Sequence, residues 1–547
     1  MIIKQTFAVA FLGLILVTGA GAQETHSHGE SETLGTVHFP VTCEQRAQAT
    51  FTRSLALLHS FGYEEARAAF KTAAEQDPGC AMASWGIAMT YYHPIWAPPT
   101  AVELAEGRAA AEKASALGAK SDREKRYVAA IGTFYRDSDR VDHRTRALAY
   151  KEAMKDLSSS FPDDSEASVF YALALLATAP ADDATFANQK EAAIILNGIL
   201  QKEPQHPGAL HYLVHAYDYP SLAELALPAA RTYAKIAPSS PHALHMPSHI
   251  FTRLGLWRES IASNLDSAEA ARRLVARTHP GAASFDALHA LDYLEYAYLQ
   301  IGDDEKALQV LQEAASAKEF DDQSFVAGYA LAAIPARFAL ERHRWDEAAK
   351  LETPSAKLPW ERFAYAQAIT SFAKALGSAR SGDPGNARAA LVKLQEAHGA
   401  LSASRIPGPY DWAGQVDSMR LAATAWLSYV EGRKDEAVEL ARAAADIEDR
   451  VGKHPVSPGS ALPARELLAD MLLDNGRPEE ALSQYEASLR VAPNRLNSLY
   501  GAARSAELSK DPGKAGRLYA KFLDNCTACA ANRADVMHAS AYLKDRK

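Results

Sequence analysis

Apolar residues return at intervals of three and four along nearly the whole chain, from about Thr42 to the C-terminus. This is the period of an amphipathic α-helix, whereas a half-buried β-strand alternates apolar and polar residues. Alanine is frequent and runs of β-branched residues are rare, which also favours helices. The pattern predicts an all-α protein.

Small and aromatic residues recur at a fixed spacing inside this helical pattern. Three segments repeat one spacing, in which the second residue follows the first by four positions and the third follows the second by three. These segments are Ala66, Phe70 and Ala73; Ala481, Tyr485 and Ser488; and Ala515, Tyr519 and Phe522. The last two sets are separated by one repeat period, from Ala481 to Ala515. A fixed period of about 34 residues predicts stacked helical hairpins, each of which buries its apolar faces against its neighbours.

The repeat resembles the tetratricopeptide repeat, a helical hairpin with small residues where its two helices cross. The resemblance covers most of residues 42–545. It implies about ten to twelve hairpins wound into a right-handed solenoid with a concave groove. The segment HALHMPSHIF, residues 242–251, is also similar to one in a group of exported bacterial tetratricopeptide proteins. This resemblance implies a fold and a compartment but no reaction.

Proline- and glycine-rich insertions interrupt the repeats at five places. Insertions longer than tight turns often cover a functional site. We expect an N-terminal repeat block over residues 42–300 and a C-terminal repeat block over residues 301–547. The insertions read YHPIWAPPTAVE, ATAPADDATF, THPGAASFDA, ASRIPGPYDW and GKHPVSPGSALP.

The first 22 residues have the pattern of a secretory signal peptide. Lys4 precedes an apolar run over residues 7–17, and Ala-Gly-Ala at residues 20–22 offers a cleavage site. The run is shorter than the ~20 apolar residues of a membrane-spanning helix, and no later stretch predicts stable membrane insertion. Residues 23–41 are polar and aperiodic, so we expect a disordered leader. The protein is predicted to be exported, to a bacterial periplasm or out of the cell.

Cysteine content, charge and missing motifs narrow the function further. Export permits disulfides, and the four cysteines allow the pairs Cys43 with Cys80 and Cys526 with Cys529. The net charge of −9 and the lack of basic runs exclude broad nucleic-acid binding. The sequence contains no HExxH, GxSxG, glycine-rich phosphate loop or CxxCH. It therefore encodes no standard zinc protease, serine hydrolase, nucleotide enzyme or c-type haem protein.

Six of the eighteen histidines fall between residues 206 and 249, in HPGALHYLVHAYDYP and PHALHMPSHIFTRLGLW. One repeat period separates His211 from His245, and the same period separates His215 from His249. Each pair therefore occupies equivalent positions of neighbouring repeats. Residues spaced by three and four share one face of a helix. By the resemblance, this face of the first helix lines the concave groove, where imidazoles from successive hairpins are expected to converge.

Imidazoles at these positions indicate a transition-metal site. Histidines at i and i+4 on one helix form a known metal-binding spacing, and imidazole suits copper, zinc, iron and nickel. We favour copper or zinc, with iron next. Six ligands exceed the three of a typical catalytic zinc site, so we expect two ions or a mixture of ligands and orienting groups. The predicted ligands are His211, His215, His242, His245, His249 and His289, with Asp218, Asp292 and Tyr296 as orienting groups or further ligands.

Three functions remain open at this point. A metal ion with an open coordination position supports a metal-dependent oxidase or hydrolase that acts on a small-molecule or peptide ligand in the groove. The alternatives are a non-enzymatic scaffold for peptides or proteins, and a metal storage or delivery protein. Histidine in place of basic or asparagine side chains disfavours the scaffold. The sequence predicts neither the substrate nor the oligomeric state.

Overall fold

The computed structural model describes residues 32–95, 98–181, 183–403 and 410–545. Within these ranges the regular structure is helical, apart from a single β-bridge between Ala283 and Phe320. The chain is all-α, as the apolar pattern predicts. None of the described helices is long and apolar enough to cross a membrane. The predicted signal peptide, residues 1–22, and the start of the predicted leader lie outside the described residues.

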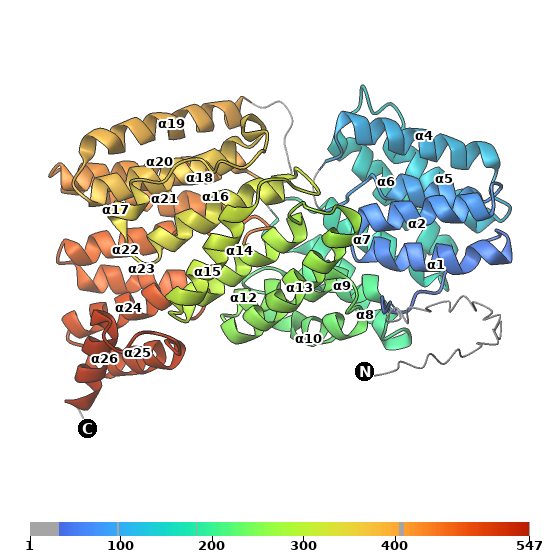
Figure 1. Ribbon diagram of the computed structural model, residues 1–547. Helices are drawn as coiled ribbons and strands as arrows, with labels where there is room; N and C mark the ends of the chain where they lie inside the picture. The colour runs from blue at the N-terminus through green and yellow to red at the C-terminus, as the bar shows by residue number, and fades with distance from the viewer. Residues whose placement is uncertain (1–31, 96–97, 182, 404–409, 546–547) are drawn as a thin grey trace, which may run out of the picture.

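Helices follow one another as antiparallel hairpins, from the blue N-terminal end to the red C-terminal end of Figure 1. The first hairpins are α1 (Gln45–His59) with α2 (Tyr63–Gln76), α3 (Ala81–Met89) with α4 (Ala101–Leu117), α5 (Asp122–Tyr135) with α6 (His143–Ser160), and α7 (Ser165–Ala177) with α8 (Ala187–Lys202). The middle of the chain forms α9 (Pro207–Tyr217), η1 (Ala223–Ala226), α10 (Leu227–Ile236), α11 (Pro241–His245), α12 (Pro247–Arg253), α13 (Trp257–Thr278), α14 (Phe285–Gln300) and α15 (Asp304–Ser316).

The C-terminal helices continue the same arrangement. They are α16 (Phe325–Leu340), α17 (Trp345–Ala348), η2 (Trp360–Arg362), α18 (Ala364–Arg380), α19 (Pro384–Ser402), α20 (Trp412–Val430), α21 (Lys434–Val451), α22 (Ala464–Asp474), α23 (Pro478–Val491), α24 (Leu496–Leu508), α25 (Pro512–Asn525) and α26 (Ala534–Lys544). The described chain is therefore a solenoid of helical hairpins, as the repeat period predicts.

The repeated aromatic residues fix how one hairpin packs on the next. Phe70 of α2 lies against Gly86 of α3, where an added Cβ would come within 2.3 Å of the ring. Tyr485 of α23 lies against Gly501 of α24 in the same way, again at 2.3 Å. Any side chain at either glycine would collide with the ring. At these two hairpins the aromatic residue therefore requires a glycine at the facing position of the next helix.

The solenoid winds tightly enough that residues far apart in the sequence touch. His211 Nδ1 donates to the backbone carbonyl of His59, 152 residues earlier, at 2.6 Å. The indole Nε1 of Trp257 donates to the carbonyl of Asn494 at 3.0 Å, across 237 residues. The green helices α9–α14 in the middle of Figure 1 are thus contacted by both earlier and later parts of the chain.

Two large apolar clusters form the core. One runs from residue 34 to residue 251 and the other from residue 288 to residue 502. The gap between the two clusters falls at α13. The histidine-rich helices lie on both sides of this division.

Residues 32–41, which we call the N-terminal strap, pack against the solenoid. Leu34, Val37 and Phe39 are buried, and the Thr36 amide donates to the Gln205 carbonyl at 2.9 Å. The expectation of a disordered leader over residues 23–41 is therefore wrong for its described part. Burial of three apolar side chains orders an extended segment that has no helical period.

The four cysteines form the two expected pairs. The disulfide between Cys43 and Cys80 ties the chain just after the N-terminal strap to the start of α3. The disulfide between Cys526 and Cys529 lies between α25 and α26. Within that loop, the Ala528 amide donates to the Ile301 carbonyl at 3.1 Å, so the loop is held against the turn between α14 and α15.

Candidate metal centre

Three stretches of helix supply the six predicted ligands, and prolines set where they begin. α9 begins at Pro207 and α11 at Pro241, in keeping with the fit of proline to the first turn of a helix. Pro247 then starts α12, so His245 and His249 lie on either side of a helix break. α14 supplies the last predicted ligand, His289.

These histidines are enclosed by the protein. His215 is partly buried, and the others are each 5% exposed or less: His211, His242, His245, His249 and His289. The sequence analysis placed them on an open concave face. The face is closed instead, because the tight winding brings the end of α1 and the segment 452–463 over it. The enclosed rings form two groups, His211, His215 and His242 (the first triad) and His245, His249 and His289 (the second triad).

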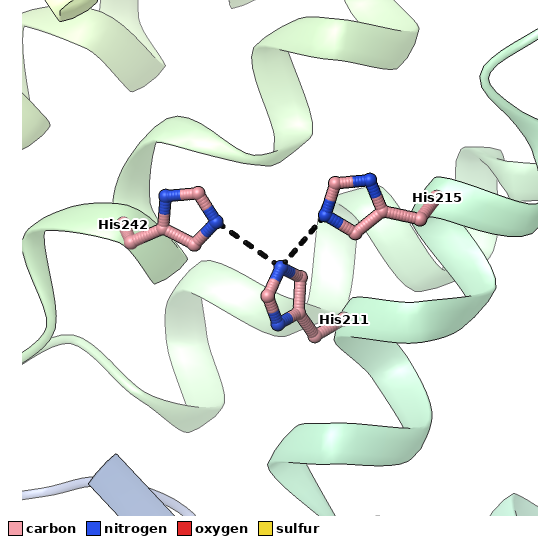
Figure 2. A group of neighbouring side chains, drawn as sticks. All are labelled: His211, His215 and His242. Atoms are coloured by element: carbon pink, nitrogen blue, oxygen red, sulfur yellow. Dashed lines mark hydrogen bonds between the residues drawn. The ribbon is translucent and has the colours of Figure 1, made fainter. Parts of the chain in front are cut away.

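In the first triad, His215 and His242 each point a ring nitrogen at Nε2 of His211 (Figure 2), and one nitrogen from each ring lies within 4.8 Å of the others. The Nε2 atom of His211 lies 3.1 Å from Nε2 of His215 and 3.1 Å from Nε2 of His242. Nitrogens bound to one zinc ion at about 2.0–2.1 Å lie roughly 3.3 Å apart when the geometry is tetrahedral. Phe61 walls the group, with its ring centroid 4.4 Å from that of His211. The arrangement fits a metal ion with three nitrogen ligands.

The second triad joins the α11–α12 segment to α14. His245 Nε2 lies 3.0 Å from His249 Nε2. The ring of His289 lies against His245, with 4.1 Å between centroids. One ligand atom from each of the three residues lies within 4.8 Å of the others. Tyr293, one turn beyond His289, packs on His245 and His249 with centroid distances of 4.8 and 5.1 Å.

Hydrogen bonds determine which ring nitrogen of the second triad carries a proton. His245 Nδ1 lies 2.6 Å from Asn264 Oδ1, and this oxygen is an acceptor because Asn264 Nδ2 donates to the Ser260 carbonyl at 2.8 Å. His249 Nδ1 lies 3.1 Å from the carboxylate of Asp218. Both Nδ1 atoms therefore carry the proton, and both Nε2 atoms present bare lone pairs to each other across 3.0 Å. Two lone pairs at that distance repel unless a cation lies between them.

The first triad has the same kind of orientation. His211 Nδ1 donates to the His59 carbonyl at 2.6 Å, so its Nε2 is a lone pair. That single lone pair faces the Nε2 atoms of both His215 and His242. A single in-plane lone pair accepts one well-aligned hydrogen bond, so it cannot satisfy both contacts equally. Ligand histidines characteristically donate their second ring N–H to a carbonyl or carboxylate in this way.

The two triads are adjacent. The rings of His215 and His249 have centroids 6.2 Å apart, and the rings of His242 and His245 are also 6.2 Å apart. Ions held by the two triads would be close enough to share a small bridging ligand.

Asp218 orients the second triad and is itself fixed by two cations. Its Oδ2 accepts from His249, and its Oδ1 accepts from Arg253 Nε at 2.8 Å. Lys453 Nζ, in the segment 452–463, donates to Oδ2 at 3.2 Å. In the same segment the Ser457 carbonyl accepts from the Tyr293 hydroxyl at 3.0 Å. The insertion GKHPVSPGSALP therefore covers the centre, as we expected of the insertions in general.

Burial keeps the imidazoles neutral. It lowers the pKa of His211 to about 3, even though the bond to the His59 carbonyl acts in the opposite direction. Burial and then neighbouring imidazoles hold the pKa values of His215, His242, His245 and His289 well below the usual 6.5. Burial would raise the pKa of Asp218, but Lys453 and Arg253 outweigh it and hold this pKa well below its usual value. The centre thus offers lone pairs beside an ionised carboxylate.

Two of the predicted orienting groups contact buried arginines. Asp292 accepts from Arg337 Nη1 at 2.6 Å, and the Tyr296 hydroxyl accepts from Arg495 Nη1 at 3.0 Å. Both residues share the helix face of His289, but buried arginines from α16 and from the start of α24 engage them. Helical position does not reveal which later arginine approaches the same face. That Asp292 and Tyr296 also serve the triads stays a prediction.

The sequence analysis missed the groups that hold the rings. Asn264 on α13, Phe61 after α1 and Lys453 in the segment 452–463 come from three distant parts of the chain. Tyr293 of α14 also packs on the second triad. Nothing in the spacing of these residues distinguishes them from packing residues. The one signal was the insertion GKHPVSPGSALP, whose length marked it as a cover.

A third cluster, His59, Glu166 and His206, is buried nearby but needs no ion. Glu166 accepts from Nε2 of His59 at 2.8 Å and from Nε2 of His206 at 3.2 Å. Their Nδ1 atoms accept from the Tyr212 hydroxyl and the Ala209 amide. Every ring nitrogen has a matched partner. This cluster contrasts with the second triad, in which the Nε2 lone pairs of His245 and His249 face each other.

Comparisons with known proteins add little to this picture. No protein-family model matches the chain, and no curated protein sequence matches it significantly. A crystal structure of yeast Tom70 overlays with a TM-score of 0.34 and 11% identity, covering 92% of this chain and 96% of that chain. The crystal structure of the APC/C hetero-tetramer Cut9-Hcn1 gives 0.28 and 12%, with the same coverage. At these scores the likeness decides nothing, and the fold rests on the hairpins described above.

Proposed function

We propose that the protein is exported and binds two transition-metal ions, one in each triad, with copper or zinc as the favoured metals and iron next. The facing lone pairs of His245 and His249 carry the proposal, because a cation between them removes a repulsion that neutral rings cannot avoid. The signal-like N-terminus supports export, and the two disulfides agree with an oxidising compartment.

Three nitrogen ligands leave a coordination position for water, oxygen or a substrate. This supports metal-dependent chemistry of the oxidase or hydrolase type. Each orienting group fixes a ring before any metal arrives, as Asn264 does for His245 and Asp218 for His249. Such preorganisation favours a resident cofactor over storage or delivery, for which exchangeable ligands are more useful.

Metal analysis tests the proposal. Protein purified without a chelator or an affinity tag of histidines should contain two equivalents of one transition metal. The double variant His211→Ala/His245→Ala should lose both while keeping its helical circular dichroism. His398→Ala removes a partly exposed histidine of α19 and is the matched control. Retention of metal by the double variant, or no metal uptake by the folded wild type, would refute the proposal.

A second candidate function is peptide binding, favoured by a groove of about 560 Å³ in the C-terminal half. Arginines and carboxylates line it together, including Arg342, Arg504 and Asp470. Mixed charge along an open groove suits an extended polar peptide. A library of mixed-charge decapeptides should then be retained by the metal-free protein and released by Arg342→Glu/Arg504→Glu. Equal retention by the variant would argue against this function.

A further inference from the structure

We infer that the triads hold a pair of copper(I) ions and that dioxygen is the ligand that bridges them. This inference rests on the proposed function, and it specifies the metal, its oxidation state and the class of substrate. Three observations carry it: the donor set of the triads, the charge around them, and their distance from each other.

The donor set consists of neutral imidazoles. Within the described part of the chain, neither triad includes a carboxylate or a thiolate. The nearby carboxylate, Asp218, already accepts from His249, Arg253 and Lys453. The ligands therefore bring no negative charge to offset that of a bound ion.

The charged groups that contact the second triad through Asp218 are net positive. Arg253 and Lys453 against Asp218 leave one positive charge beside the triads. Two divalent ions would add four more charges to this enclosed site, whereas two copper(I) ions add two. Burying uncompensated charge is costly because the interior solvates it poorly. The smaller buried charge of two copper(I) ions therefore favours a monovalent metal.

Three nitrogens per ion also suit copper(I). A d¹⁰ monovalent copper ion is stable with three nitrogen ligands, whereas zinc in proteins is almost always four-coordinate. Each triad supplies three nitrogens, which is one ligand fewer than zinc usually takes. Copper(I) fills the triads as they stand.

Dioxygen is the small ligand that this pair can reduce without any other reactant. Facing rings of the two triads lie 6.2 Å apart, so a two-atom molecule can contact both ions. Each copper(I) gives one electron and becomes copper(II), and dioxygen takes both electrons to reach the peroxide level. The oxygen–oxygen single bond remains and two copper–oxygen contacts form. The two added positive charges meet two added negative charges, so the buried net charge does not change.

An anaerobic titration with copper(I), in competition with the chelator bathocuproine disulfonate, tests the first step. Two equivalents should bind per chain. Exposure to dioxygen should then give an intense near-ultraviolet charge-transfer band and no copper(II) signal in electron paramagnetic resonance, because the two spins couple through the bridge. The oxygen–oxygen vibration in resonance Raman spectra should shift when ¹⁸O₂ replaces ¹⁶O₂.

Variants with a single substitution test the two triads separately. His215→Ala in the first triad and His289→Ala in the second should each retain one strongly bound copper and lose the band entirely, whereas His398→Ala should keep both features. Each variant is checked for native helical content, and the remaining copper confirms that the other triad is intact. An uncoupled copper(II) signal from the oxygenated wild type would overturn the inference.

Other outcomes separate this inference from the proposed function. Two zinc ions per chain with no uptake of copper(I) would overturn the inference and leave metal binding in place. Binding of copper(I) that is inert to dioxygen would do the same. A folded protein that takes up no metal would overturn both.

Discussion

At the scale of single residues, Asn264 fixes the tautomer of His245 and so leaves its Nε2 atom available to a metal ion. Its amide nitrogen donates to the Ser260 carbonyl at 2.8 Å, which leaves its oxygen to accept from His245 Nδ1. Asn197 makes the same bond to the carbonyl four residues before it, at 2.8 Å, and serves no histidine in the described structure. The two asparagines differ in the orienting contact.

Asn264→Ala is therefore expected to weaken metal binding by about 10–100-fold, the usual effect of losing a group that orients a ligand. Asn197→Ala removes the same intrahelical bond and should leave affinity unchanged. Competition against a chromophoric chelator measures both affinities. Equal values for the two variants would contradict the tautomer assigned to His245.

Buried neutral histidines also make the metal-free protein sensitive to acid. The unfolded chain protonates the ring of His211 near pH 6.5, whereas the folded protein does so only at about pH 3. The folded pKa is lowered, so stability from this group is fully present above pH 6.5 and falls as the pH drops towards 3. The fall approaches about 1.4 kcal/mol per pH unit for each such group.

His211→Asn keeps a donor for the His59 carbonyl and removes the titration. Urea unfolding of the metal-free variant between pH 6 and pH 4 should show a pH slope smaller by about 1.4 kcal/mol per unit than the wild type. An unchanged slope would mean that the ring of His211 is protonated in the folded state.

The ligands of the candidate centre were predictable from the sequence, but the groups that orient most of them were not. The repeat period placed His211 and His245 at equivalent positions of neighbouring hairpins, and the structure brings both into triads. Asp218 was found because it follows the histidines on the same helix face. Asn264 and Lys453 were not, because their contacts depend on how distant segments meet.

At the scale of elements, the N-terminal strap shows what the helical period cannot reveal. Phe39 is 1% exposed. Its ring lies 5.5 Å from that of Phe51 and 4.9 Å from that of Tyr127, so it joins α1 to α5. A short extended segment has no period to detect, whereas the helices around it were predicted from their apolar spacing.

Phe39→Ala should therefore cost about 3–5 kcal/mol, the range for losing a buried aromatic side chain. Val102→Ala on α4 is the control, because Val102 is 71% exposed and such changes stay within about 0.5 kcal/mol. Urea denaturation gives both values. A cost below about 1 kcal/mol for Phe39→Ala would mean that the strap is not part of the folded core.

At the scale of the whole molecule, the candidate centre joins segments that a plain solenoid keeps apart. Its ligands come from α9, α11, α12 and α14. Its supports come from the end of α1, from α13 and from the segment 452–463. In a linear repeat array each hairpin contacts only its neighbours. The repeat pattern predicted the hairpins, but not the tight winding that lets non-neighbours meet.

Metal should accordingly stabilise the molecule as a unit. At a free metal concentration of 100 times the Kd, each site contributes about 2.7 kcal/mol. Differential scanning calorimetry of metal-free and metal-loaded protein should show the main unfolding transition moving upwards as one peak. Two separate transitions, of which metal moves only one, would contradict coupling through the centre.

The cover formed by residues 452–463 has a consequence for the lifetime of a bound ion. Lys453 and Ser457 hold this segment across the second triad through Asp218 and Tyr293. An ion enclosed in this way could leave only when the covering segment opens. Its residence time would then be set by the rate of local unfolding. Neither the strength nor the concentration of a competing chelator should change the rate of release.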